Sequence, residues 1–318
     1  MKTVKNTALP VLVKRNVKCF FKDKGMFFTA LITPLILLVL YATFLYKVYA
    51  DSFRSSLPAG VVIGDKALGG LVGGLLLSSL LAVSSVTVSF CANLAMVQDR
   101  VTGANRDFAV SPVKPHTVAL GYYLATVINA LIIGIVTAIL GFIYLAFTGW
   151  YLSALDILAI VLDIFLLIMF GTALSSLICY PLTSQGQLSA VGSIVSSTYG
   201  FICGAYMPIS QFSTGLQRAL MFFPGTYGTS LIRNHALRGV CAQMRADGFP
   251  QEAIDGFRKV ADCDLNFFSH KVEIWAMYLI VIGTIAVILG AYIVLQAVAE
   301  KKRLRAQNPK NADSASEK

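Results

Sequence analysis

The sequence predicts an all-α integral membrane protein with six transmembrane helices, and three observations carry this prediction. Hydrophobic residues make up 56% of the 318 residues and charged residues only 13%, whereas a soluble domain carries about 25% charged residues. Six apolar runs follow one another along the chain, and each is long enough to cross a bilayer, which takes about 20 residues. Basic residues gather at both ends of the chain, outside these runs, as they do at the cytoplasmic ends of spans.

The first predicted element is a basic amphipathic helix, residues 1–25, which lies on the inner face of the membrane. Its apolar and basic residues recur at helical spacing on two different faces. The apolar face consists of Leu9, Val13, Val17, Phe20 and Phe21, and the basic face of Lys14, Lys18 and Lys22. Such a helix is typical of the lipid–water interface. A disordered basic tail and a cleaved signal peptide are the alternatives, but the apolar run that follows is too long for a signal peptide.

The six predicted spans occupy residues 26–298. Runs of about 30 residues exceed the hydrocarbon thickness, so we expect the longest spans to tilt, bend or project from the bilayer. The spans are residues 26–48, 67–97, 118–148, 153–180, 188–207 and 272–298. Because basic residues precede the first span and follow the last, both termini are expected in the cytoplasm, with 299–318 as a disordered basic tail. The net charge of +10 therefore indicates orientation in a membrane and not nucleic-acid binding.

A polar segment, residues 98–117, joins the second and third predicted spans on the cytoplasmic side. Its charged side chains can form ion pairs with a soluble partner, and Gly103 allows a close approach between backbones. Pro112 ends helical structure before the third span. The candidate contact residues are Asp99, Arg100, Gly103, Arg106, Asp107, Ser111 and Pro112. The alternative is a solvated loop that only orients the spans.

An outer segment, residues 208–271, separates the fifth and sixth predicted spans. Its apolar core, residues 219–227, is too short to span and is interrupted by Pro224 and Gly225. We therefore predict a re-entrant hairpin of two short helices that enters the outer leaflet and returns. Its marker residues are Pro208, Pro224, Gly225, Tyr227 and Arg233.

The six cysteines show no metal-binding spacing, so no metal site is predicted in this chain. Cys241 and Cys263 lie in the same outer loop, where an oxidising exterior favours a disulfide between them. Two free thiols in a mobile loop are the alternative. The other four cysteines are expected to be small packing residues, and they are Cys19, Cys91, Cys179 and Cys203.

Small residues recur at helical spacing in two predicted spans. Gly69 and Gly73 are four residues apart, as are Gly70 and Gly74, and this spacing lets helices approach closely. In the fifth predicted span a stripe of small residues either packs against another helix or faces a pathway through the membrane, and the sequence favours neither. The stripe consists of Ser189, Ser193, Ser196, Gly200 and Gly204.

Two acids lie in the fourth predicted span. Ser153 and Asp156 match a capping box at the start of the helix, so Asp156 is expected to be structural. Asp163 lies two turns deeper, where a charge is costly, and is by default a functional candidate with Asn129 as a possible partner. The alternative for Asp163 is a buried, hydrogen-bonded structural acid.

Two motifs and the predicted layout resemble the ABC-2-type exporter permeases, and together they cover most of the chain. DRVTGANRDFAVSPVKPHTVALGY resembles the family's cytoplasmic signature of an acid, Arg, Gly and Ser-Pro, with Asp99 where the family usually has Glu. GAYMPISQFSTGLQRALMFFPGTYGTSLIR resembles its outer signature, which runs from Pro-Ile-Ser through Thr-Tyr to a final Arg.

The resemblance implies that this chain is the pathway and not the motor. Residues 98–117 would contain a coupling helix that seats in an ATPase subunit, a separate chain that binds ATP and Mg. The present chain has no G-x-x-x-x-G-K-[ST] motif and no catalytic constellation, so it is not expected to be an enzyme or to bind a cofactor itself. Two permease chains, identical or different, and two ATPase chains would form the working unit in a bacterial-type plasma membrane.

The implied function is ATP-driven export of a hydrophobic or amphipathic substrate, such as a drug, antibiotic, lipid or peptide. Export of a polysaccharide or lipid-linked glycan is the alternative within the class. Two alternatives come from other classes: an ion-coupled secondary transporter with Asp163 as its coupling group, and a membrane scaffold or sensor subunit. The direction of transport follows from the family resemblance alone.

Overall fold

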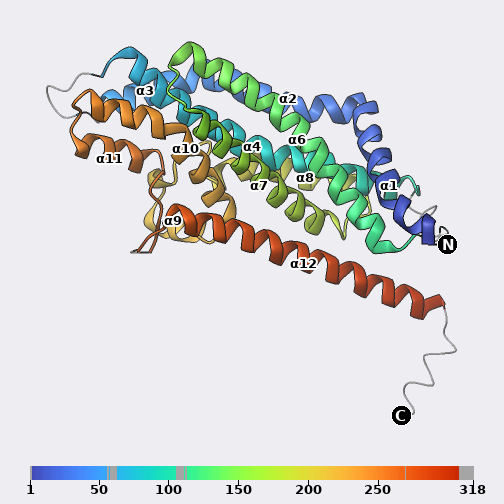
Figure 1. The fold of residues 1–318 in the computed structure, drawn as a ribbon. Coiled ribbons are helices and arrows are strands. Elements are labelled where there is room, and N and C mark those ends of the chain that lie inside the picture. The colour runs from blue at the N-terminus through green and yellow to red at the C-terminus, as the bar shows by residue number, and fades with distance from the viewer. Residues whose placement is uncertain are drawn as a thin grey trace.

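The computed structural model describes residues 2–55, 57, 63–104, 111, 113–268 and 270–307. Within these residues the chain is almost entirely helical, which confirms the all-α class (Figure 1). The helices are α1 (Lys2–Lys22), α2 (Lys24–Leu40), α3 (Tyr46–Ser55), α4 (Asp65–Val101), α6 (Pro115–Thr148), α7 (Ala154–Cys179), α8 (Gln185–Ile202), α9 (Thr214–Leu220), α10 (Pro224–Ala246), α11 (Gln251–Val260) and α12 (Ile274–Gln307). Shorter elements are the π-helical η1 (Tyr41–Leu45), the 3-10 turn η2 (Ile209–Gln211) and an antiparallel pair, β1 (Asn266–Phe267) and β2 (His270–Lys271).

Five of the six predicted spans coincide with helices that are long and apolar enough to cross a membrane. They are Lys24–Ser55, Asp65–Val101, Pro115–Thr148, Ala154–Cys179 and Ile274–Val298. The remaining predicted span, residues 188–207, corresponds to α8, which ends earlier, at Ile202. Ser, Gly and Gln residues make α8 more polar than the most apolar 18-residue stretches of these five helices. Its 18 residues extend about 27 Å at 1.5 Å per residue.

Helix α4 forms the centre of the bundle and packs against α2, α6, α7, α8 and α10. Its approach to α6 depends on Gly69, where an added Cβ would lie 2.1 Å from the carbonyl oxygen of Thr148. Gly74 likewise lies close to α10, because its Cβ would lie 2.8 Å from a methyl group of Leu237 and 3.1 Å from the carbonyl oxygen of Ala236. The predicted packing role of these glycines is therefore confirmed.

The last turn of α4 marks one end of the bundle, which we call the Asp99 end. Arg15 of α1 and Tyr122 of α6 both contact Asp99 there. Helix α12 reaches the same end, because the Tyr180 hydroxyl just after α7 donates to the carbonyl of Leu295. Helices α3 and α11 lie at the opposite end of the bundle (Figure 1). The N-terminal helix and the C-terminal part of α12 therefore lie at the same end.

Helix α1 is present as predicted, but the face that it buries only partly matches the expected one. Phe20 of the expected apolar face is buried, together with Leu12 and Asn16, which were not assigned to that face. Leu9, Val13 and Val17 of the expected face are only half-buried. The reason lies in α6, where Gly121 has no side chain and leaves room for Leu12. The contact with Gly121 of α6 thus determines which face of α1 is buried.

Helix α12 also departs from expectation at its end. It continues to Gln307, so residues 299–307 are helical and not the disordered tail that the composition suggested. Residues 308–318 lie outside the described residues.

The outer segment contains two consecutive helices with a break where Pro224 predicts it. Pro224 is the first residue of α10 and follows Phe223 in extended conformation. At 23 residues, α10 is longer than the short helix expected. It begins deep in the bundle, because Gly228 faces Leu167 of α7, where an added Cβ would lie 2.4 Å from a methyl carbon. Leu167 lies about 20 Å along α7 from the first residue of that helix.

Candidate functional site

The side chain of Asp99 joins three helices at the Asp99 end. It accepts hydrogen bonds from both terminal nitrogens of Arg15, one of them at 3.1 Å, and from the Tyr122 hydroxyl at 2.5 Å. The hydrogen bond from Arg15 to Asp99 raises the pKa of Arg15 above its already high ordinary value. Helices α1, α4 and α6 are therefore fixed to one another at this point by a largely buried carboxylate.

The neighbouring Arg100 caps the end of α7. Its Nη1 donates to the carbonyl oxygens of Cys179, Tyr180 and Leu182, at a helix terminus where the last carbonyls lack intrahelical partners. Its guanidinium also lies over the Tyr180 ring, 5.4 Å from the centroid. Arg100 thereby holds the last turn of α4 against the last turn of α7.

The rest of the predicted coupling segment is described only in part. Gly103 has φ of +81° and open space around it, so it ends α4 in a left-handed conformation that suits glycine. Ser111 accepts a hydrogen bond from the amide of Val113. Arg106, Asp107 and Pro112 lie outside the described residues. Asp99 and Arg100 make their contacts within the chain, while contact of this segment with an ATPase stays a prediction.

The predicted stripe on α8 divides into an exposed half and a packed half. Ser189 and Ser193 are exposed and Ser196 is half-buried. Gly200 lies beneath the ring of Tyr206, whose nearest atom would be 2.3 Å from an added Cβ. Gly204 follows the helix with φ of +75°. The first two turns of the stripe thus face away from the chain, whereas its end packs against the outer segment.

A buried ion pair fixes the outer segment to the bundle. Arg233 Nη1 lies 3.0 Å from Asp262, and its Nη2 donates to the carbonyl of Gly204 and to the hydroxyl of Ser79. Asp262 also accepts the backbone amide of Ile209 at 2.6 Å. Burial raises the pKa of Asp262, and the charge of Arg233 opposes that rise. Sequence analysis named Arg233 but missed Asp262, which lies 29 residues away in the chain.

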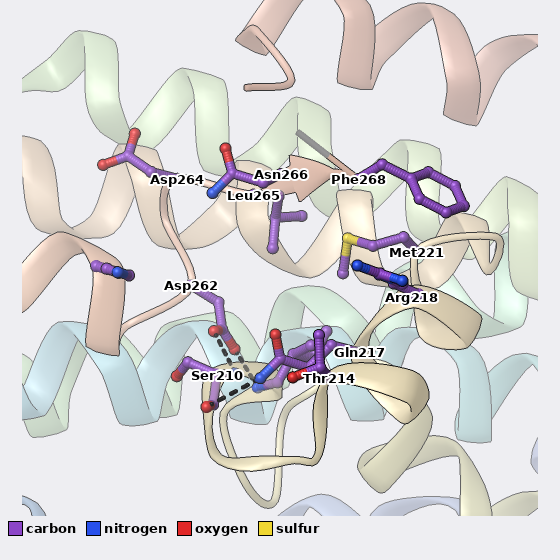
Figure 2. Close-up of a pocket in the computed structure, with 12 residues that line it drawn as sticks. Ser210, Thr214, Gln217, Arg218, Met221, Asp262, Asp264, Leu265, Asn266 and Phe268 are labelled. Atoms are coloured by element: carbon purple, nitrogen blue, oxygen red, sulfur yellow. Dashed lines mark hydrogen bonds between the residues drawn. The ribbon is translucent and has the colours of Figure 1, made fainter. Parts of the chain in front are cut away.

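A cavity of about 220 Å³ lies beside this ion pair, between α9 and the loop that follows α11 (Figure 2). Figure 2 shows the Asp262 carboxylate directed at Ser210. Arg218, another lining residue, lies over the ring of Phe268, 5.7 Å from its centroid. Asp264, another wall residue, is already paired with Arg258 and Lys271. Burial raises the pKa of Asp264, but its hydrogen bonds from Arg258 and Lys271 outweigh burial and lower it overall.

The other marker residues of the outer segment have structural contacts. Pro208 precedes η2. The Tyr227 hydroxyl donates to the carbonyl of Met221 at 2.6 Å, which closes the turn between α9 and α10. Gly225 faces Tyr199 of α8, where an added Cβ would lie 2.7 Å from the hydroxyl. This turn therefore packs directly on the end of α8.

Asp163 is the centre of a polar cluster that links three helices. One carboxylate oxygen lies 2.7 Å from Nδ1 of His235 on α10, and the other accepts the Tyr278 hydroxyl of α12 at 2.7 Å. Asn129, the possible partner suggested by the sequence, is not among the side chains that contact Asp163 in the described residues, because His235 and Tyr278 take that place. Asp156, by contrast, forms the expected capping box with Ser153. It also pairs with Arg238 of α10.

Cys241 and Cys263 are free thiols in the structure, buried in the same hydrophobic cluster. Burial raises the pKa of the Cys263 thiol to about 12 and also raises that of Cys241. Because the thiolate is the reactive form, burial lowers the reactivity of both thiols. The structure contains no Cys241–Cys263 disulfide, which stays a prediction for the cell. Among the described residues, no cluster of three or more His, Cys, Asp or Glu could hold a metal ion.

The comparison with protein families identifies one match. Residues 7–236 match the model of the ABC-2 type transporter family. A comparison with curated proteins found no match. The matched region contains α1, the Asp99 end, α8 and the outer segment as far as the first half of α10. Because the match extends over well more than half of the residues, this multi-pass membrane chain belongs to the ABC-2 type transporter family.

Proposed function

We propose that this chain is the permease subunit of an ATP-driven ABC exporter, powered by a separate ATPase subunit that binds ATP and Mg. The observation that carries the proposal is the construction of the Asp99 end. Asp99 and Arg100 tie the start of the coupling segment to α1, α6 and α7. A force applied to residues 98–117 would therefore reach four helices at once, which is what coupling to a motor requires.

The proposal includes six crossings, with α8 as the fifth, and a re-entrant hairpin formed by α9 and α10. Two observations support it. The extent of α8, about 27 Å, approaches a hydrocarbon core of about 30 Å. Helix α1 and the end of α12 both lie at the Asp99 end, and an even number of crossings returns the chain to the side of the membrane on which it started. Both termini would then be cytoplasmic, in a bacterial-type plasma membrane, since the Asp99 end carries the basic N-terminal helix.

The substrate is proposed to be hydrophobic or amphipathic, in the class of drugs, antibiotics, lipids or peptides. The exposed part of α8 supports this, because Ser189 and Ser193 provide small hydroxyls beside the apolar Ile194, which is 61% exposed. A second permease chain, identical or different, would cover this face and complete the pathway. Export of a polysaccharide or lipid-linked glycan is the alternative within the class.

The test is purification of the tagged chain from its native host, followed by identification of any bound ATPase and measurement of ATP hydrolysis. The test variant reverses two charges of the coupling segment, Arg106→Glu with Asp107→Lys. The control variant reverses the exposed pair at the opposite end of the bundle, Arg54→Glu with Asp65→Lys. We expect the wild type and the control to retain the ATPase and the test variant to lose it. A wild type that is folded in the membrane but holds no ATPase contradicts the proposal.

A second candidate function is ion-coupled secondary transport, and the cluster around Asp163 favours it. A buried carboxylate beside His235 and Tyr278 can exchange a proton or a cation with a pathway. This function requires substrate uptake or release in sealed vesicles that follows an ion gradient in the absence of ATP. Transport that needs ATP and survives collapse of all ion gradients excludes it.

A further inference from the structure

Helix α1 leaves an apolar face uncovered when it packs on the bundle. Its buried face, which includes Leu12 and Phe20, is already occupied by α6 and the rest of the core. The half-buried residues of the neighbouring face form one wall of a groove with a volume of about 700 Å³, and α6 forms the other wall. The lining residues are Leu9, Pro10, Val13 and Val17 of α1, and Leu124 and Ile128 of α6, together with Lys14 and Lys18.

The position of α6 shows which surroundings the groove faces. Its 34 residues extend about 51 Å, against a hydrocarbon core of about 30 Å, so roughly 10 Å projects at each end when it is centred. Leu124 and Ile128 lie about 14 and 20 Å from the first residue of α6. Both are therefore within the hydrocarbon region, and the groove opens to the acyl chains of the leaflet at the Asp99 end.

The two lysines give the groove a charged rim. Lys14 and Lys18 are four residues apart on α1 and both are exposed. Within the described part of the chain neither forms an ion pair, whereas Arg15 between them does. Long lysine side chains at this level extend to the headgroups while their methylene groups remain on apolar surface. Two such charges favour an anionic headgroup over a zwitterionic one.

We propose that this groove binds one anionic phospholipid from the leaflet at the Asp99 end. An acyl chain lies between α1 and α6, and the headgroup phosphate lies between Lys14 and Lys18. The bound lipid bridges α1 and α6 on the side opposite the Arg15–Asp99 contact. It therefore stabilises the position of α1, and through Arg15 the position of Asp99. This inference depends on the membrane and not on export or on the identity of a motor.

The experiment reconstitutes the full-length chain with mixed phosphatidylglycerol and phosphatidylcholine and counts retained lipids by native mass spectrometry. We expect the wild type to retain phosphatidylglycerol in preference to phosphatidylcholine. Lys14→Gln with Lys18→Gln should weaken phosphatidylglycerol retention roughly ten- to thirty-fold. The matched control, Lys47→Gln with Lys66→Gln, removes two exposed lysines from α3 and α4, remote from the groove, and should leave retention unchanged.

A second variant and a second measurement test the groove itself. Val13→Trp should fill the groove and reduce retention while both lysines remain. Hydrogen–deuterium exchange of residues 9–18 should slow when phosphatidylglycerol is added to the wild type, but not when it is added to Val13→Trp. Equal retention of the two lipids by the wild type overturns the proposal. So does an equal loss of retention in the two lysine pairs, because it would mean a general attraction to anionic lipid without a site.

Discussion

Two ion pairs of this chain place the same chemical groups in opposite surroundings. The side chains of Arg233 and Asp262 are 2% and 4% exposed, whereas those of Arg54 and Asp65 are 53% and 95% exposed. Removal of one partner from a buried pair leaves a charge without compensation and costs about 3–5 kcal/mol. An exposed pair contributes about 0–1 kcal/mol. We therefore expect Arg233→Met to destabilise the protein strongly and Arg54→Met to have little effect.

Thermal unfolding of the detergent-solubilised variants measures this difference, and limited proteolysis shows where it acts. Cleavage should concentrate in residues 204–273 of Arg233→Met, because the lost ion pair holds that segment. If the two variants unfold at the same temperature, the buried pair does not stabilise the outer segment.

The hydrogen bonds around Asp163 contribute to the stability of the protein, and substitutions can measure that contribution. Asp163→Leu removes the acceptor for the Tyr278 hydroxyl and the partner of His235. Each polar contact of this kind within a membrane contributes about 0.6 kcal/mol on average, so we expect a loss of about 1 kcal/mol in the free energy of unfolding. Tyr278→Phe should lower stability by less, and should cost little more in the Asp163→Leu background. Additive losses would contradict a shared hydrogen bond.

The sequence indicates the role of a residue most clearly when its partner lies only a few residues away in the chain. Ser153 and Asp156 form a capping box three residues apart, and it was predicted correctly. Asp99 and Arg15 are 84 residues apart, and only the folded chain brings them together. The motif therefore indicated that Asp99 matters, while its partners on α1 and α6 could not be inferred. Asp262 was missed for a similar reason, because it lies 29 residues from its partner Arg233 along the chain.

Glycines separate two kinds of helix in this bundle. An added Cβ at Gly69 of α4 would lie 2.1 Å from a backbone carbonyl oxygen of α6, whereas at Gly283 of α12 nothing lies within 4 Å. Gly69→Ala should force α4 and α6 apart and lower the unfolding temperature. Gly283→Ala should be neutral or stabilising, because alanine exceeds glycine in helix propensity by about 1 kcal/mol.

The measurement is again thermal unfolding, with both alanine variants in the same detergent. Both glycines lie inside long helices, so the gain in helix propensity on substitution by alanine is the same in the two variants. A difference between their unfolding temperatures therefore cannot come from helix propensity. A stable Gly69→Ala protein would contradict the close approach of α4 and α6.

Helices proved more predictable than their ends and faces. Composition alone located the five long apolar helices, because burial in lipid demands uninterrupted apolar residues. It could not end α8 at Ile202, since that end depends on the packing of Gly200 and Gly204 against the outer segment. Composition also could not indicate which face of α1 is buried, because that depends on the close contact between Leu12 and Gly121 of α6.

At the scale of the whole molecule, the exposed surfaces of the spans differ in polarity. Helix α7 presents residues such as Leu155, Leu158 and Leu162 to the exterior, which suits lipid. Helix α8 presents Ser189 and Ser193, whose hydroxyls gain nothing from acyl chains. The apolar stretch of the central α4 is fully covered by its own chain. If α8 crosses the membrane, as proposed above, its exposed face suits a protein partner better than lipid.

A cysteine on that face tests whether the partner is a second copy of this chain. In a variant whose native cysteines are replaced by serine, we expect Ser193→Cys to form an intermolecular disulfide in the membrane under mild oxidation. Leu158→Cys, on the 66% exposed leucine of α7, is the control and should not cross-link. Cross-linking at both positions would indicate random collision. Cross-linking at neither would mean that the α8 face meets a different chain or a water-filled pathway, because small hydroxyls in a span are not suited to lipid.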